Sequence, residues 1–287
     1  MTKLIYDEKK NLSKKLAILI PNFNGQLFII KTLGLLFEAF PNIDIVVVDD
    51  ASTDDSIKLL EESNVKLLKR ISNGGFAAAV NTGLKFLQKE GVDFVLVCNS
   101  DLSPTKDQGN NVLESLYCNI NDRLGVIGFI ENEKFKNINR PTSDISGFLF
   151  WIKLEILDQT GFMDERFYMY GEETDFFRRI TRAGFDIIQS NIVVSHLTEM
   201  SATSKIRNSW YAIRNSIFLE VKNKHYFAAV RKIGVLLLVM WRIRGDENDA
   251  STLRVRRPGV LVGPILLLCA MVWNVFYIIL PNRQGES

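Results

Sequence analysis

The sequence predicts an α/β fold whose central sheet is mostly parallel. Short, nearly continuous apolar runs alternate with helical patterns in the first hundred residues, as expected for strands buried on both faces. Each of these runs ends in polar residues, which favours a ligand-binding edge. A basic and apolar tail follows this part of the chain, and it predicts helices that meet a membrane.

The apolar runs are "LAILI" at residues 16–20, "IDIVVV" at 43–48 and "FVLV" at 94–97. Helical patterns occupy residues 27–40, between the first two runs, and begin again at 54–62. Because helices separate the runs, we expect the strands to pair in parallel, with helices flanking the sheet.

Polar side chains follow three strands, and parallel strands bring their carboxyl ends to one edge of a sheet. The pairs are Asn22 and Asn24, Asp49 and Asp50, and Asn99 and Asp101. A cleft lined by these groups needs a ligand or water to satisfy them. One Asp at a strand end, completed by water and diphosphate oxygens, is a common way to bind Mg²⁺, so Asp101 predicts a divalent metal site.

The segment "NGGFAAAVNTGLKF", residues 73–86, is a glycine-rich loop that leads into a helix. Such a loop lets backbone N–H groups approach an anion at a helix start. The sequence has neither GxGxxG nor a P-loop, and the absence of GKS and GKT argues against a P-loop ATPase.

Three carboxylates stand together in "MYGEETDFFRR", residues 169–179. Glu172, Glu173 and Asp175 would fill the first turn of a helix, arginines its last turns, and Gly184 its end. Taken alone, this pattern indicates either an ordinary charged helix or a carboxylate that accepts a proton in a reaction. The local residues leave both readings open.

Two further apolar runs predict strands in the second half of this region. "GFLFWIKLEIL" covers residues 147–157, and its Trp151 suits either the core or the underside of a sugar. "DIIQSNIVVSH" ends at His196, which is either a structural residue or a metal ligand. The polar segment at 131–144 predicts a surface loop.

The charge of the chain is unevenly distributed, although its net value is only +2. From Ser201 onward there are 13 Lys and Arg against 5 Asp and Glu, and the first 200 residues hold 22 against 28. A basic tail on an acidic body favours an anionic partner. The tail lacks the interleaved aromatics and modules of nucleic-acid binders, so phospholipid is the favoured partner and nucleic acid is not expected.

Residues 260–280, "VLVGPILLLCAMVWNVFYIIL", carry no charge and follow a cluster of arginines. This length suits a membrane-spanning helix or a buried core helix, and residues 233–241 suit an interfacial helix. The first 15 residues lack the apolar stretch of a cleavable signal. The three cysteines are odd in number and no two are closely spaced, so they form neither a disulfide framework nor a zinc pattern, which favours a reducing compartment.

Six motifs in this order resemble the family 2 glycosyltransferases of GT-A fold, and their pattern is most similar to the bacterial rhamnosyltransferase-like branch. They are "LAILIPNFNG", "IVVVDDASTDDS", "NGGFAAAVNTGL", "VLVCNSDL", "GFMDERFYMYGEETDFFRR" and "VSHLTEMS". The resemblance covers residues 15–214. It implies transfer of a sugar from a nucleotide diphosphate sugar to a hydroxyl, with inversion at the anomeric carbon.

The resemblance also implies roles for individual residues. The nucleotide side of the site would comprise Pro21, Asn22, Asn24, Asp49, Asp50, Asn73, Gly75, Asn81 and Asn99. Asp101 matches the family's metal-binding Asp, and His196 matches a histidine that holds the metal or diphosphate in some members. Glu173 matches the general base, which is usually Asp in the family, so Glu172 or Asp175 takes part if the longer side chain displaces the carboxylate.

The resemblance further implies a GT-A catalytic domain at residues 1–215. Its nucleotide-binding half would be about 15–105 and its acceptor half about 106–215, followed by a helical, membrane-associated tail at 216–287. A neutral Asn replaces the first acid of the usual metal motif at position 99. The expected cofactor is still Mg²⁺ or Mn²⁺.

Together these observations predict an inverting transferase at the cytoplasmic face of the cell membrane, held peripherally or by a single span. Its donor would be a dTDP- or UDP-linked sugar, with rhamnose the first candidate. Its acceptor would be a lipid-linked glycan in surface polysaccharide synthesis. The alternative is a non-catalytic nucleotide-sugar-binding or scaffold protein that retains the fold, which the residues at positions 99 and 173 would permit.

Overall fold

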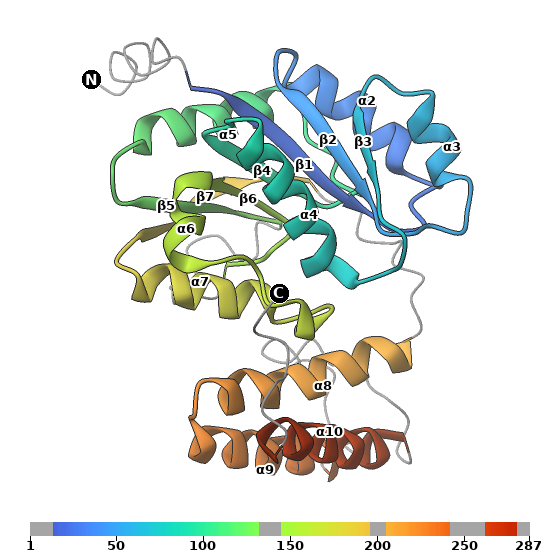
Figure 1. Ribbon diagram of the computed structural model, residues 1–287, viewed down its shortest axis with the longest axis vertical. Coiled ribbons are helices and arrows are strands. Elements are labelled where there is room, and N and C mark those ends of the chain that lie inside the picture. Colours follow the sequence, from blue (N-terminus) through green and yellow to red (C-terminus); the bar gives the residue numbers. More distant parts are fainter. Residues whose placement is uncertain (1–13, 132–144, 196–204, 242–261, 280–287) are drawn as a thin grey trace. The chain divides into compact units, whose positions relative to one another are not determined.

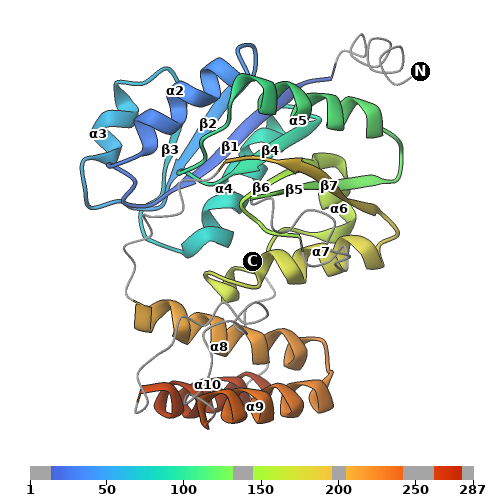
Figure 2. The ribbon, with the colours of Figure 1, turned by 180° about the vertical axis from the view of Figure 1, so that it is seen from behind.

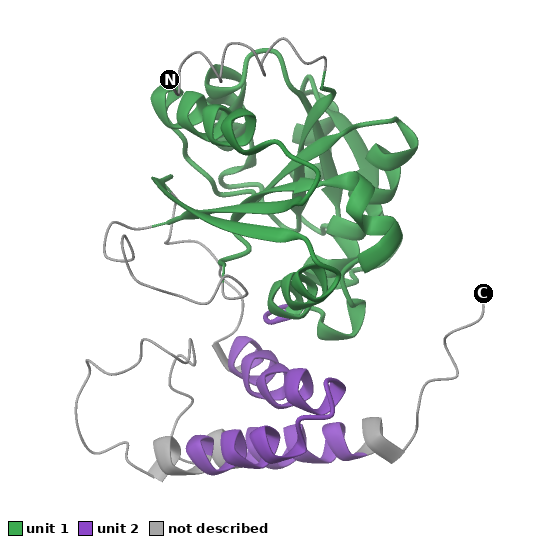
Figure 3. Cartoon of the chain, turned by 90° about the vertical axis from the view of Figure 1, so that its left-hand side faces the viewer, with its two compact units in different colours: residues 1–168, 172–200 green, residues 169–171, 201–287 purple. Residues whose placement is uncertain are grey.

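The computed structural model describes residues 14–131, 145–195, 205–241 and 262–279 of the 287-residue chain. The chain divides into two compact units (Figure 3). Unit 1 comprises residues 1–168 and 172–200, and unit 2 comprises residues 169–171 and 201–287. The unit boundary at residue 200 thus precedes the domain boundary predicted at residue 215. His196 and nearly all of the predicted loop at 131–144 lie outside the described residues.

A seven-stranded sheet forms the centre of unit 1, in the order β3-β2-β1-β4-β6-β5-β7. The strands are β1 (Leu16–Asn22), β2 (Asp44–Asp49), β3 (Lys66–Lys69), β4 (Phe94–Cys98), β5 (Leu124–Ile130), β6 (Leu149–Lys153) and β7 (Asp186–Val193). β1 is parallel to both β2 and β4, and β6 alone in this sheet runs antiparallel to its neighbours β4 and β5. The predicted mixed, mostly parallel sheet is therefore confirmed.

Helices cover both faces of this sheet (Figures 1 and 2). They are α2 (Ile29–Ala39), α3 (Ser56–Glu61), α4 (Gly75–Lys89), α5 (Lys106–Asn119), α6 (Leu157–Thr160) and α7 (Glu172–Arg182). Alternate residues of β1 supply two separate cores, because successive side chains of a strand point to opposite faces. Leu19 belongs to the core beneath α4 and α7, and Ile20 belongs to the core beneath α2 and α5.

The second half of the sheet differs in detail from the prediction. The apolar run at 147–157 forms a strand only over β6, after which the chain turns through residues 154–156 into α6. Trp151 on β6 is fully buried, and its Nε1 donates to the carbonyl of Val112 at 3.1 Å. This residue is therefore part of the core and does not lie beneath a sugar.

Unit 2 contains α8 (Lys205–Lys222), α9 (Tyr226–Trp241) and α10 (Val262–Ile279). Within this unit, α8 lies across the layer that α9 and α10 form (Figures 1 and 3). Ile213 and Ile217 of α8 share one apolar core with Leu236 and Ala270 of the other two helices.

Polar contacts also stabilise unit 2. Glu220 accepts from Lys232 at 2.8 Å, which joins α8 to α9. Asn215 on α8 donates to the carbonyls of Met169 and Tyr170, at 2.8 and 2.7 Å. Within the described residues, no helix combines the length and apolar character that crossing a membrane requires.

Candidate functional site

The carboxyl ends of β1 and β2 carry the first two predicted polar pairs. The structure brings one residue of each pair, Asn22 and Asp49, into contact. Asn22 donates to the Asp49 carboxylate at 2.9 Å. Asp49 also accepts from the backbone N–H and the hydroxyl of Ser52, at 2.8 and 2.6 Å. Asp49 is fully buried, so its contacts fix the turn that follows β2.

Asn24 connects the loops that follow these two strands. It has a φ of 52°, in the left-handed region that Asn tolerates better than most residues. Its side chain accepts from the backbone N–H of Thr53 at 2.8 Å, and its own N–H donates to the Ser52 hydroxyl at 2.9 Å. Pro21 is half-buried at the end of β1, beside this pair of loops.

Asp50 occupies the helix start that the glycine-rich loop provides. Its carboxylate accepts from the backbone N–H of Gly75 at 2.7 Å and from that of Gly74 at 3.1 Å. Arg70 donates to the same carboxylate at 2.7 Å through Nε. The anion at the start of α4 is thus supplied by the protein itself, and this explains why the loop needs glycines without being a phosphate loop.

The glycine-rich loop also contacts the segment that precedes the acidic helix. The Tyr168 hydroxyl donates to Asn73 at 2.7 Å, and the Tyr168 carbonyl accepts from Phe76 at 2.9 Å. A β-carbon on Gly75 would lie 2.2 Å from that carbonyl oxygen, so only glycine fits. Tyr168 is not among the predicted site residues, although the run "YMYG" before the acids is a local signal of an unusual turn.

Asn81, predicted on the nucleotide side, is buried on α4 and is occupied by backbone contacts. It accepts from the N–H of Met163 at 3.0 Å and donates to the Met163 carbonyl at 2.9 Å. It also donates to Glu165 at 2.9 Å. Its contacts attach α4 to the turn before the acidic helix.

The three candidate acids occupy different environments at the start of α7. Glu172 is buried, and one of its carboxyl oxygens has no hydrogen-bond partner among the described residues. Burial, and next the charge of Glu173, raise the pKa of Glu172 well above its usual value. Asp175 is buried in an ion pair with Arg179 at 3.0 Å, and this pair has a structural role.

Glu173 is half-buried and lies beside the chain that enters β6. A β-carbon placed on Gly147 would be 3.4 Å from both Cβ and Cγ of Glu173, so the two residues are in van der Waals proximity. The next residue of that chain, Phe148, accepts at its carbonyl from the Asn99 N–H at 2.9 Å. The segment at 147–148 therefore lies between Glu173 and the end of β4.

Asp101 lies half-buried in the loop that follows β4. Ser103, two residues on, donates its N–H to the Ser195 carbonyl at 2.9 Å, so the chain directly before His196 reaches this loop. Among the described residues, no three His, Cys, Asp or Glu side chains form a metal-binding cluster. One carboxylate beside an amide still fits Mg²⁺ or Mn²⁺ when diphosphate and water supply the other oxygens.

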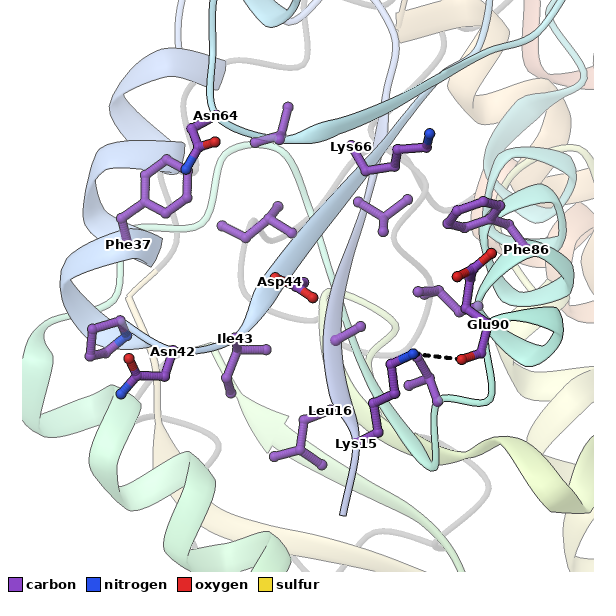
Figure 4. Close-up of a pocket in the computed structure, with 17 residues that line it drawn as sticks. Lys15, Leu16, Phe37, Asn42, Ile43, Asp44, Asn64, Lys66, Phe86 and Glu90 are labelled. Atoms are coloured by element: carbon purple, nitrogen blue, oxygen red, sulfur yellow. Dashed lines mark hydrogen bonds between the residues drawn. The ribbon is translucent and has the colours of Figure 1, made fainter. Parts of the chain in front are cut away.

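A cavity of about 550 Å³ lies at the opposite edge of the sheet (Figure 4). It is lined at the starts of the first three strands by residues that include Lys15, Asp44 and Lys66. Lys15 crosses one side of it and donates to the carbonyl of Glu90 at 2.6 Å. Ligands of such sheets bind at the carboxyl ends of the strands, so this cavity is separate from the candidate site.

Comparison with known proteins relates this arrangement to enzymes that transfer sugars. A family model described as "Glycosyl transferase family 2" matches residues 17–186. The undecaprenyl-phosphate mannosyltransferase of Micrococcus luteus is 29% identical over 134 residues, which are 45% of this chain and 54% of that protein. The chain spans between 34% and 54% of the length of the first three curated relatives that it matches.

Solved structures share the fold. The mannosyltransferase PcManGT from Pyrobaculum calidifontis, in complex with GDP-Man and Mn²⁺, has a TM-score of 0.59 at 18% identity, over 96% of this chain and 94% of that one. S. aureus TarS 1–349, in complex with UDP-GlcNAc, has a TM-score of 0.55 at 17% identity, over 91% of this chain and 81% of that one. The architecture of unit 1 is accordingly the GT-A fold.

Proposed function

Because the chain belongs to glycosyl transferase family 2, we propose that it is an inverting hexosyltransferase that moves a sugar from a nucleotide diphosphate to a hydroxyl group. The observation that carries this proposal is the unequal pair of carboxyls at the start of α7. Glu172 is buried with a raised pKa, whereas its neighbour Glu173 is half-buried beside Gly147. Burial disfavours a charge on Glu172, which leaves Glu173 as the carboxylate of this pair that is placed to accept a proton.

The other acids of this helix are less suitable as the base. Glu172 is withdrawn from solvent, and Asp175 is held by Arg179. The position of Glu173 in the first turn of α7 also suits a carboxylate, because the helix dipole stabilises a negative charge there. We therefore assign the general base to Glu173, with Glu172 as its buried neighbour.

In the proposed reaction, Glu173 removes the proton of the acceptor hydroxyl as its oxygen bonds to the anomeric carbon. The bond from that carbon to the diphosphate oxygen breaks, and the diphosphate leaves with the electron pair, so the configuration inverts. Asp101 would hold the divalent cation, with His196 as a second candidate ligand. When bound, that cation supplies positive charge that offsets the charge developing on the leaving diphosphate.

The donor and acceptor follow from the resemblance of the motifs. We propose a dTDP- or UDP-linked sugar as donor, with rhamnose the first candidate, and a lipid-linked glycan as acceptor at the cytoplasmic face of the membrane. The likeness to an undecaprenyl-phosphate mannosyltransferase supports an acceptor on a lipid carrier. The likeness to a structure that holds GDP-Man requires that GDP-linked donors are tested as well.

The test is turnover by the purified full chain with a panel of dTDP-, UDP- and GDP-linked sugars. Lipid-linked oligosaccharide extract serves as the acceptor, and Mg²⁺, Mn²⁺ and EDTA are compared. We expect one donor to be used, EDTA to abolish transfer, and the product linkage to have the opposite anomeric configuration from the donor. A retained configuration would exclude the inverting reaction.

The alternative function, a protein that binds a nucleotide sugar without transferring the sugar, predicts a different result in this experiment. Calorimetry would then detect binding of one donor, while neither transfer nor donor hydrolysis occurs with any acceptor extract. Binding with no turnover would overturn the proposed reaction and leave the fold assignment intact.

A further inference from the structure

We infer that unit 2 docks on an anionic lipid surface through one face of the layer that α9 and α10 form. This inference deepens the proposed function, because a lipid-linked acceptor requires the enzyme to work at a membrane.

One side of α10 is apolar and exposed. Ile265, Leu268, Val272 and Val275 are exposed, the first two by 61% and 62%. Successive residues of an α-helix turn by about 100°, so these spacings of three and four place all four side chains on one side. An exposed stripe of four aliphatic side chains on one helix is more than scattered surface apolarity.

The reverse side of α10 is occupied by α8. Asn274 donates to the carbonyl of Arg214 at 3.3 Å, and Trp273 packs edge-on against Phe218 with ring centroids 5.0 Å apart. Leu267 belongs to the core that α8 shares with α10. Since α8 covers that side, the stripe faces away from α8.

The start of α9 adds large side chains to this exposed surface. Phe227 is 85% exposed and Val230 is 65% exposed, while Ala229 and Leu236 are buried in the core shared with α8. Tyr226, beside Phe227, is also exposed. Aromatic rings at the end of an interfacial helix suit the head-group region of a bilayer.

The positive charge of unit 2 favours an anionic partner for this face. Lys224 and Arg231 are exposed at the start of α9, where they flank the aromatic pair. In residues 205–241 and 262–279, Glu220 is the one acid, and it is already paired with Lys232. Two copies of this chain that met through the same face would bring like charges together, whereas anionic lipid head groups would neutralise them.

The experiment is co-sedimentation of the full chain with vesicles of phosphatidylglycerol and phosphatidylcholine, compared with vesicles of phosphatidylcholine alone. We expect binding to the anionic vesicles that weakens with salt. Phe227→Ser with Leu268→Ser should lower the partition coefficient at least about tenfold, because two large apolar side chains no longer enter the bilayer. Lys224→Glu with Arg231→Glu should lower it at least about fivefold.

Matched controls carry the same kinds of chemical change on residues of unit 1. Leu27→Ser removes an apolar side chain that is 73% exposed, and Lys106→Glu reverses an exposed charge at the start of α5. Both should bind vesicles like the wild type. Circular dichroism checks that all variants are folded, and since the changed residues are exposed, we expect unchanged spectra.

Three outcomes would overturn the inference. The wild type fails to bind anionic vesicles, the two double variants bind as well as the controls, or light scattering shows a dimer that Leu268→Ser dissociates. Donor hydrolysis measured without vesicles reports separately on the proposed function. Loss of hydrolysis with vesicle binding intact would contradict the proposed function and leave the docking face standing.

Discussion

Gly75 and Tyr168 approach so closely that a β-carbon on the glycine would lie 2.2 Å from the tyrosine carbonyl oxygen. Gly75 has a φ of +82° and Tyr168 a φ of 66°, so both residues have the positive φ that L-residues with a side chain rarely adopt. Their contact joins the glycine-rich loop, which Asp50 holds, to the turn that leads into the acidic helix. The predicted nucleotide side and the predicted base of the site therefore depend on one local packing arrangement.

Gly75→Ala should lower the free energy of unfolding more than the same change at a glycine whose added β-carbon would touch no neighbouring atom. The added methyl clashes with backbone as well as straining φ, so we expect a loss of about 3 kcal/mol in the free energy of unfolding. Gly91→Ala is the control, because Gly91 has a φ of +69° and no atom within 4 Å. Its strain alone should cost about 1 kcal/mol in urea unfolding. Equal losses in the two variants would refute the close contact.

Asp50→Asn should destabilise unit 1 because it removes the charge that Arg70 and two backbone N–H groups share. Breaking such a largely buried pair should cost about 2–4 kcal/mol. Glu61→Gln at the exposed pair with Lys69 is the matched control, and it should cost less than about 0.5 kcal/mol. Thermal and urea unfolding of both variants measure the difference, and similar small losses would show that Asp50 does not hold the loop.

Asn81→Ala should unfold more easily because the backbone N–H and carbonyl of Met163 lose their partner in a buried place. The expected cost is about 2–3 kcal/mol. Asn110→Ala, at an exposed position on α5, should be nearly neutral by comparison. If Asn81→Ala kept full stability and lost only donor affinity, Asn81 would be a nucleotide contact, as the motif resemblance predicts, and its structural role would be minor.

Glu172→Gln should increase stability above the acid range. Because burial and Glu173 raise the pKa of Glu172, the folded chain keeps a proton that the unfolded chain releases above the usual value of 4.5. Wild-type stability therefore falls as pH rises from that value toward the folded pKa. The variant lacks this penalty, so its advantage should be small near about pH 4 and larger near about pH 8. A constant difference across this range would contradict the raised pKa.

Much of the fold was predictable because local pattern and burial agree. The runs "LAILI", "IDIVVV" and "FVLV" became β1, β2 and β4, since strands buried on both faces need continuous apolar sequence. The four-residue β3, "KLLK", escaped prediction because it is short and has lysines at both ends. The antiparallel placement of β6 between β4 and β5 depends on pairing between distant segments, which no local pattern encodes.

The location of the candidate site at the carboxyl ends of the strands was predictable from the sequence, whereas most of the individual hydrogen bonds there were not. Strand ends that carry Asn22 and Asp49 meet as parallel pairing requires. That the Asp50 carboxylate would occupy the start of α4, and that Asn81 would bond to Met163, depend on how loops fold back on the sheet. Such contacts join residues far apart in sequence, and one sequence read alone does not contain them.

The most direct test of the proposed reaction is the rate of sugar transfer by Glu173→Gln beside Glu172→Gln, with donor affinity measured by calorimetry on both. We predict that Glu173→Gln loses about 10²–10⁴-fold in kcat while it binds donor like the wild type, because only the proton acceptor is gone. Glu172→Gln should keep most of the rate, since the buried Glu172 is not placed to accept the proton. A Glu173→Gln variant that transfers sugar at the wild-type rate would contradict the assignment of Glu173 as the base.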